Sequence, residues 1–481
     1  MRTTSMGRRV VGRVASVAFA LVVLLAGTAS CQQATGHGQD WSRFGFDAAR
    51  TNEGPKETGI TASDLSALKR QQVQVGGTVD GPAIYLHGVQ IEGALHDAFF
   101  VTTTYGETLA IDADRGTVLW RFTPPGYAGW AGSYRITTAT PVADSNRRAV
   151  YAAAPDGVVR KLAVADGSVQ WSTAVTKLPE REKIASALNL ADGRVIVVTG
   201  GYFGDAPPYQ GHVAVLDSGT GHVENVWNAL CSDRGGLLDP SSCASSGAAI
   251  WGRAAAVVDP ASGDLFVATG NALWDGKTAW GDAALELSPD ACKLLGNYTP
   301  SNTAQLDASD LDLGSTAPVL LGNGLVVQGG KDGKIRLLRW SAMLGQTGHQ
   351  GGELQTVSTP SGTDLFTAPA VWHAGGKTWL IAADNGGTEA WKLSQGRLQT
   401  AWKNAHGGTS PVVAGGLLYV YDPAGGLRVY EPDTGRLLAD LASGPGHWNS
   451  PIATDGRIAL PEGNANQHRT SGVLDIWRVG H

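Results

Sequence analysis

Short apolar segments alternate with turn residues along almost the whole chain. Between residues 247 and 338, GAAIWGRAAAVVDPASGDLFVATGN is followed by WGDAALELSPDACKLLGNYTPSN, DLDLGSTAPVLL and GLVVQGGKDGKIRLL. Each piece holds β-branched or other apolar residues bounded by Gly, Pro, Asp or Asn, which is typical of short strands joined by tight turns. The pattern predicts an all-β protein with no helix longer than the weakly amphipathic segment TASDLSALKR.

Two signatures recur in this pattern. The first is an Asp-containing turn that leads into an apolar segment, as in IDADRGTVLW, AVADGSVQW, VLDSGTGHVENVW, ELSPDACKLL and YEPDTGRLL, and all of these but ELSPDACKLL also contain Gly. The second places Pro before apolar residues, as in TTATPV, GSTAPV, FTAPAV, GTSPVV and WNSPIA. Because Pro is tolerated at the first residue of a strand, the second signature marks where an inner strand begins.

The signatures divide the chain into about eight units, which begin near residues 78, 137, 183, 249, 314, 366, 408 and 448. Units of about 40–65 residues fall in the range at which propeller blades repeat. A four-stranded blade cannot cover both of its faces, so blades stack on their neighbours, and closing the ring removes the exposed ends. The sequence therefore predicts an eight-bladed β-propeller.

The two ends of the chain lack the repeat. Residues 1–30 are expected to be a signal peptide, 31–75 a lead segment that lies outside or across the ring, and 76–481 the propeller. The final segment SGVLDIWRVG has the pattern of a strand without a blade of its own. We expect it to close the ring by pairing with strands from the N-terminal side.

The first thirty residues resemble a secretory leader. Four Arg precede or enter an uncharged run, VASVAFALVVLLAGTAS, which is short for a membrane span and rich in small residues at its end. Cys31 follows Thr-Ala-Ser, as at the processing site of bacterial lipoproteins, so either lipidation of Cys31 or ordinary cleavage nearby is expected. Export to a periplasmic, envelope-anchored or secreted location would allow a Cys231–Cys243 disulfide and leave Cys292 free.

The composition limits the kinds of partner that the protein is expected to bind. The 481 residues include 65 Gly and 3 Met, charged residues are 17%, and the net charge is −6. Abundant Gly favours many turns over long helices. Binding to nucleic acid would need a basic stripe, which the sequence lacks, and contact with a membrane is expected only through the leader or a lipid anchor.

The repeated turns resemble those of the pyrroloquinoline quinone (PQQ) propellers, and residues 39–70 resemble the lead of the quinoprotein alcohol dehydrogenases. In the middle of the chain, SSGAAIWG, ATGN and DLDLGSTAP are similar to the polyvinyl-alcohol-dehydrogenase branch of that family. The resemblance covers nearly all of the chain after the leader. It implies an eight-bladed propeller of the quinoprotein alcohol dehydrogenase-like type, although non-catalytic propellers such as the outer-membrane assembly lipoprotein use the same blades.

The resemblance also implies a site with PQQ and Ca²⁺ as cofactors. Trp251 matches the indole on which the quinone stacks, and Asn271 matches the amide ligand of Ca²⁺. Asp312 matches the base that accepts the proton of an alcohol, Asp310 would be a second metal ligand, and Lys331 matches the cation that faces the quinone oxygens. Without the resemblance, the commoner interpretation is a core indole for Trp251 and a turn residue for Asn271, and the charged residues would be solvated.

Three features depart from the family pattern. The family provides a Glu to the metal from the blade before the Trp, and the nearest carboxylate here is the shorter Asp205. No two cysteines are adjacent, so the Cys-Cys ring that covers the quinone in many members is missing. No Cys-x-x-Cys-His motif occurs, so an enzyme of this kind would pass electrons to an external acceptor such as a cytochrome.

Two functions therefore remain open from the sequence. One is an exported quinoprotein dehydrogenase-like enzyme that oxidises an alcohol. The other is a non-catalytic propeller, anchored through Cys31, that binds a protein partner at the cell envelope.

Overall fold

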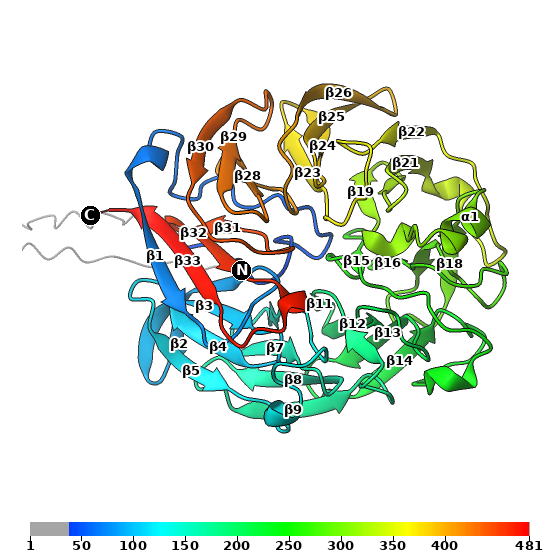
Figure 1. Cartoon of the computed structure of the whole chain (residues 1–481), viewed down its shortest axis with the longest axis horizontal. Coiled ribbons are helices and arrows are strands. Elements are labelled where there is room, and N and C mark those ends of the chain that lie inside the picture. The colour runs from blue at the N-terminus through cyan, green and yellow to red at the C-terminus, as the bar shows by residue number, and fades with distance from the viewer. Residues whose placement is uncertain (1–37, 481) are drawn as a thin grey trace, which may run out of the picture. The chain divides into compact units, whose positions relative to one another are not determined.

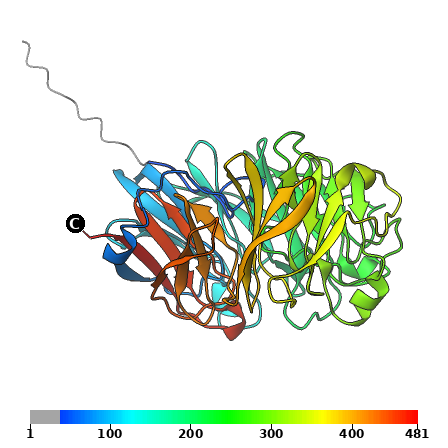
Figure 2. The ribbon, with the colours of Figure 1, turned by 90° about the horizontal axis from the view of Figure 1, so that it is seen from above.

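The computed structural model describes residues 38–480, so the predicted leader and Cys31 lie outside the described residues. Eight antiparallel sheets follow one another around a ring (Figure 1). Viewed edge on, their strands run between the two faces of the ring (Figure 2). The structure confirms the predicted all-β, eight-bladed propeller.

The first four blades take up residues 84–298. Their strands are β2 (Ile84–Ile91), β3 (Ala94–Thr102), β4 (Thr108–Asp112) and β5 (Val118–Phe122); β6 (Val142–Ala143), β7 (Ala149–Ala153), β8 (Val158–Ala163) and β9 (Val169–Ala174); β10 (Glu182–Ile184), β11 (Asn189–Ala191), β12 (Arg194–Gly201), β13 (His212–Asp217) and β14 (Val223–Asn228); and β15 (Val257–Val258), β16 (Leu265–Ala268), β17 (Ala284–Leu287) and β18 (Leu294–Tyr298).

The other four blades complete the ring. Their strands are β19 (Val319–Gly322), β20 (Leu325–Gln328), β21 (Lys334–Arg339) and β22 (Gln355–Ser358); β23 (Ala370–Ala374), β24 (Lys377–Ala383), β25 (Thr388–Ser394) and β26 (Arg397–Asn404); β27 (Val412–Ala414), β28 (Leu417–Tyr421), β29 (Leu427–Tyr430) and β30 (Leu437–Leu441); and β31 (Ile452–Thr454), β32 (Arg457–Glu462), β33 (Val473–Val479) and β1 (Leu68–Gln74).

Helices are few and short within residues 38–480. They are α1 (Thr303–Ala308) and the 3₁₀ turns η1 (Leu65–Ala67), η2 (Tyr127–Gly129), η3 (Pro240–Ser242), η4 (Leu313–Ser315), η5 (Trp340–Ala342) and η6 (Ala465–Gln467). The predicted amphipathic segment 61–70 forms only η1 and the start of β1, because residues 68–70 pair with β33 in the last sheet. No helix of the described part is long and apolar enough to cross a membrane.

The last blade is assembled from both ends of the chain. β33 pairs antiparallel with β1, from Leu68 opposite Val479 to Gln74 opposite Val473. The prediction that the final segment closes the ring is therefore confirmed, and its partner strand comes from within the predicted lead segment. Pairing of the two ends leaves no blade with an uncovered neighbour.

The Asp- and Gly-containing turns join the third and fourth strands of their blades, and they explain the Trp that follows them. Trp120 of the first blade lies against Gly167 in the next blade's turn, and its indole N–H donates to the carbonyl of Val164 at 2.8 Å. Trp171 packs in the same way on Gly221, and Trp402 packs on Gly435. Each of these blades thus packs its Trp ring on a Gly of the following blade, where the missing side chain leaves room for the indole.

This packing predicts a specific cost for Gly167→Ala. A Cβ at Gly167 would lie 2.6 Å from the Trp120 ring, in addition to the strain of its φ of +71°. Gly396 has nearly the same φ, +72°, but no atom within 4 Å of such a Cβ. We expect Gly167→Ala to lower the free energy of unfolding by about 1–3 kcal/mol more than Gly396→Ala, which isolates the backbone strain. Urea unfolding of both variants measures the difference, and equal losses would contradict this packing.

The lead segment crosses the ring on the side toward which the inner strands run. Its backbone meets six of the eight blades, through the pairs Trp41 and Tyr85, Ser42 and Ala143, Ala48 and Val258, Thr51 and Val371, Asn52 and Val413, and Thr58 and Gly456. Arg50 at its centre is 2% exposed and donates to the carbonyls of Phe44, Leu188 and Ala254. The buried guanidinium therefore ties the lead segment to the third and fourth blades.

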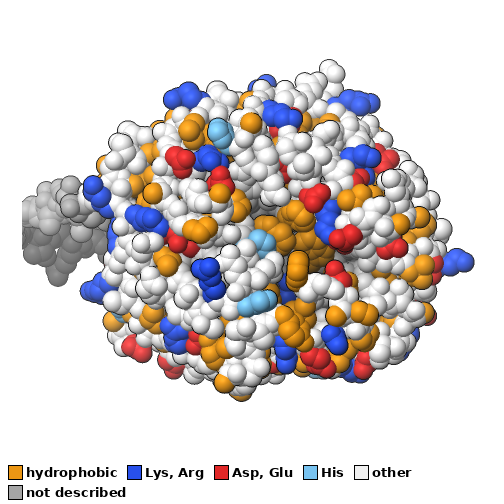
Figure 3. Space-filling view, viewed as in Figure 1, with side chains coloured by type: hydrophobic (Ala, Val, Ile, Leu, Met, Phe, Trp, Pro, Cys, Tyr) orange, Lys and Arg blue, Asp and Glu red, His pale blue; other side chains and the backbone are white. Residues whose placement is uncertain are grey.

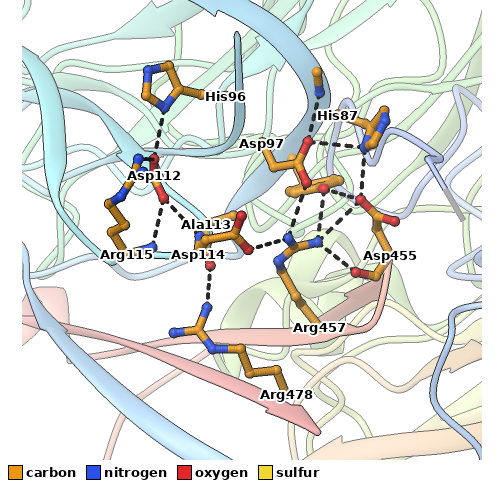
Figure 4. Close-up of polar contacts among 12 residues, drawn as sticks. His87, His96, Asp97, Asp112, Ala113, Asp114, Arg115, Asp455, Arg457 and Arg478 are labelled. Carbon is orange, nitrogen blue, oxygen red and sulfur yellow. Dashed lines mark hydrogen bonds and ion pairs between the residues drawn. The ribbon is translucent and has the colours of Figure 1, made fainter. Parts of the chain in front are cut away.

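The seam between the first and last blades is held by charge (Figure 4). Arg457 of β32 donates to Asp97 at 3.1 Å and to Asp455 at 3.2 Å. The imidazole of His87 lies 3.1 Å from Asp97 and 2.9 Å from Asp455. His87 and these two carboxylates are close enough together to share a cation, and the guanidinium of Arg457 already pairs with both acids, so these ion pairs join the two blades.

The cysteines pair as predicted. Cys231 and Cys243 form a disulfide whose Cα atoms are 5.9 Å apart, and Cys292 is free and exposed. The bridge closes a loop beside the fourth blade, where Gln210 donates toward Cys243.

Candidate functional site

The predicted site residues lie where inner strands begin or second strands end. Trp251 precedes β15, Asn271 follows β16, Asp312 immediately precedes η4, and Lys331 follows β20. All four positions precede an inner strand or follow a second strand, whereas the lead segment contacts residues within or after the inner strands, such as Ala143, Val258 and Val371. Neighbouring blades thus deliver them to one place.

Two glycines allow these segments to touch. A Cβ at Gly270 would lie 2.1 Å from Oδ1 of Asp312, and one at Gly314 would lie 2.4 Å from the carbonyl carbon of Thr269. Any larger residue at either position would separate the Gly270-Asn271 turn from the turn that carries Asp312.

Direct contacts join the polar residues. The backbone N–H of Asn271 donates to Oδ1 of Asp312 at 2.7 Å, and its side-chain amide donates to Asp310 at 2.9 Å. Lys331 forms an ion pair with Asp312 and a second one, at 3.1 Å, with Asp310. The Lys331 ammonium also lies 5.5 Å from the centroid of the Trp251 ring. The structure thus brings together Trp251, Asn271, Asp310, Asp312 and Lys331.

The two carboxylates have different environments. The side chain of Asp312 is 12% exposed and that of Asp310 is 76% exposed. Burial raises the pKa of Asp312 above its usual range, against the opposing charge of Lys331. Burial alone would lower the pKa of Lys331, but Asp312 and Asp310 outweigh it and raise that pKa. Asp312 is therefore a better proton acceptor than an exposed aspartate, beside a lysine that stays charged.

The donor set fits a hard cation. The side-chain oxygen of Asn271 is buried and accepts no hydrogen bond from any described residue. An acceptor of this kind costs free energy unless a donor or a cation satisfies it. Because Asp310 and Asp312 lie beside it, amide and carboxylate oxygens of the type that Ca²⁺ prefers are already grouped.

Asp205 lies on the loop that follows β12. It accepts a hydrogen bond from the Tyr209 hydroxyl at 3.1 Å, and no hydrogen bond or ion pair among the described residues joins it to Asn271. The pKa of Tyr209 is raised, mainly by burial and to a smaller extent by the charges of Asp205, Asp312 and Asp310. Asp205 thus shares the electrostatic environment of the acidic pair without contacting it.

Sequence reasoning missed two aromatic neighbours of Trp251. The rings of Phe366 and Trp448 lie 5.9 and 5.8 Å from that of Trp251, centroid to centroid, and 5.3 Å from each other. All three are half-buried, and in Figure 3 hydrophobic side chains gather around the hollowed centre of one face. Both residues belong to the recurring signatures FTAPAV and WNSPIA, so in the sequence they were interpreted as parts of the repeat and not of the site.

A buried ionic cluster supports this aromatic group. Asp80, whose side chain is fully buried, accepts from Arg253 at 2.6 Å and lies 2.7 Å from the imidazole of His447. Burial would raise the pKa of Asp80, but the charges of Arg253 and His447 hold it well below its usual range. The Trp448 ring lies 4.0 Å from the His447 ring and 4.7 Å from the Arg253 guanidinium. The first, fourth and last blades are therefore tied together at the axis.

A family model matches most of the chain. The model PQQ_2, described as Outer membrane protein assembly factor BamB, matches residues 66–229 and 301–465. No curated protein was found to be similar in sequence.

Three solved structures illustrate the fold. Quinohemoprotein alcohol dehydrogenase from Comamonas testosteroni gives a TM-score of 0.69 at 15% identity, over 92% of this chain and 80% of that chain. A europium-containing methanol dehydrogenase gives 0.63 at 16% identity, over 92% and 98%. BamB from Moraxella catarrhalis gives 0.53 at 11% identity, over 86% and 98%. At such identities the likeness establishes the shared propeller and leaves the chemistry to the residues of the site.

Proposed function

The chain belongs to the PQQ_2 family of propellers, and we propose that within this family it is a quinoprotein-like enzyme that oxidises an alcohol with PQQ and Ca²⁺. One observation carries the proposal: a buried amide oxygen without a donor, a buried carboxylate and a lysine converge beside an indole. A propeller that served only as a scaffold would have no need to assemble these groups.

The chain's own residues have distinct roles in this proposal. Asn271, with Asp310 and Asp205 as further oxygen donors, would hold Ca²⁺, and the Trp251 ring would stack on the flat cofactor. When bound, the quinone would take up a hydride equivalent, helped by the Lewis acidity of Ca²⁺. Asp312 would accept the proton of the substrate hydroxyl, and Lys331 would hold Asp312 in place and orient the quinone oxygens.

The enzyme proposal includes export and an external acceptor. Residues 1–30 would direct export, and Cys31 would be either the lipidated residue or close to the cleavage site. Because no Cys-x-x-Cys-His motif is present, the electrons would leave through a separate protein such as a cytochrome.

A titration with PQQ and Ca²⁺ tests the proposal. Quenching of tryptophan fluorescence should saturate at one PQQ per chain, and a dye should then be reduced on addition of alcohols. Trp251→Ala should weaken PQQ binding by about ten-fold or more, because the stacking surface is lost. Trp372→Ala, which removes an indole on β23 away from the site, should leave the affinity unchanged.

A second candidate, a scaffold at the cell envelope, is favoured by the description of the matching family and by the lack of a Cys-Cys ring. Wild-type protein that shows no saturable PQQ binding would overturn the enzyme proposal in its favour.

A further inference from the structure

Asp282 lies behind the proposed site and has no part in the roles described above. It is fully buried on the loop before β17 and has a left-handed φ of +47°. A non-glycine residue in this conformation costs about 1 kcal/mol or more, so its surroundings must hold it there.

Two hydrogen bonds connect Asp282 to both halves of the site. Its backbone N–H donates to the carbonyl of Gly270 at 2.9 Å, next to the proposed ligand Asn271. Its Oδ1 accepts from the backbone N–H of Leu313 at 2.9 Å, next to the proposed base Asp312. With the bond from Asn271 N–H to Asp312, these contacts form a closed circuit between the two turns.

We infer that Asp282 is a positioning residue, which fixes the turn bearing the base against the turn bearing the metal ligand. This inference deepens the proposed function and rests on it for the identity of those two groups. Gly270 and Gly314 permit the two turns to touch, but a glycine supplies no side-chain bond to keep them in register. The Asp282 carboxyl adds a buried bond behind the site to the bonds that Asp312 and Asn271 make between the two turns.

The remaining oxygen supports this assignment. Oδ2 of Asp282 is buried without any hydrogen-bond partner among the described residues. Burial, followed by the charges of Asp312 and Asp307, raises the pKa of Asp282 to about 8. Near neutral pH the group is therefore a neutral acid that bonds to Leu313 without placing a second negative charge beside Asp312. Asparagine has the same shape and the same neutrality.

Hydrogen–deuterium exchange of the protein without cofactor tests the positioning directly. In Asp282→Ala, amides of residues 309–316 should exchange about ten-fold faster, because the turn loses its anchor, whereas Asp282→Asn should exchange like the wild type. Asp282→Ser, which is too short to reach Leu313, replaces the Ala variant if that variant does not fold.

Asp384 provides a matched control. It is buried in the sixth blade and accepts from the backbone N–H groups of Ser361, Gly386 and Gly387. Asp384→Ala should speed amide exchange in the loops that Asp384 holds and leave the exchange rates of residues 309–316 unchanged.

The same variants are then titrated with Ca²⁺ in the presence of PQQ. Asp282→Ala should weaken Ca²⁺ binding by about 10–100-fold, while Asp282→Asn and Asp384→Ala bind like the wild type. The inference would be overturned if the amides of residues 309–316 exchanged at the wild-type rate in Asp282→Ala, or if they exchanged as fast in Asp282→Asn as in Asp282→Ala. Absence of Ca²⁺ and PQQ binding in the wild type would refute the proposed function instead, and the exchange data would still decide the positioning role.

Discussion

Asp312→Asn should lower kcat for alcohol oxidation by about 10²–10⁴-fold while leaving PQQ affinity within about three-fold of the wild type. The amide cannot accept the hydroxyl proton, but it preserves the size of the carboxylate and can still accept the bond from Asn271. Stopped-flow dye reduction gives kcat, and fluorescence titration gives the affinity. A matched change of an exposed turn residue, Asp433→Asn, should affect neither quantity.

The pH profile provides an independent check on Asp312. Only the ionised form accepts a proton, and burial raises its pKa above the usual range. The value of kcat/KM should therefore increase as pH rises through that raised pKa and level off above it. Activity that persists in Asp312→Asn with an unchanged acid limb would show that another group is the base.

Arg50→Met should destabilise the protein more than any surface substitution. Three carbonyls, of Phe44, Leu188 and Ala254, would lose their donor in a buried place, at about 1–3 kcal/mol each. We expect the free energy of unfolding to fall by about 3–5 kcal/mol, since part of the loss is relieved by local relaxation. Guanidinium unfolding followed by circular dichroism measures the change.

The comparison variant for Arg50 is Arg148→Met. Arg148 is exposed and its side chain makes no hydrogen bond among the described residues, so Arg148→Met should change the free energy of unfolding by no more than about 0.5 kcal/mol. A loss below about 1 kcal/mol in Arg50→Met would contradict the view that the lead segment is an integral part of the ring.

The architecture could be predicted because it is repetitive. Each blade reuses the same local solutions, namely a strand-starting Pro and a Gly on which a Trp such as Trp120 packs. These solutions involve residues close in sequence or one blade apart, so they leave a periodic trace. The path of the lead was less predictable, because Arg50 binds carbonyls at Leu188 and Ala254 that no sequence pattern identifies.

The site was predicted in part for a related reason. Trp251, Asn271, Asp312 and Lys331 stand at strand ends, where a resemblance could identify them one by one, and the structure places them together. Their roles in catalysis remain a proposal. Phe366 and Trp448 were hidden within repeat signatures, and Asp282 resembles any turn aspartate, because its importance lies in contacts with Gly270 and Leu313 that only the folded chain reveals.

The crossing of the lead segment has a kinetic consequence. Because the lead segment crosses one face of the ring around the buried Arg50, we expect the proposed cofactor site to be approached from the opposite face. An alcohol and an electron acceptor would have to visit that face in turn, so each would act as a competitive inhibitor of the other at high concentration. Steady-state rates at varied concentrations of both should then give the parallel double-reciprocal lines of a substituted-enzyme mechanism.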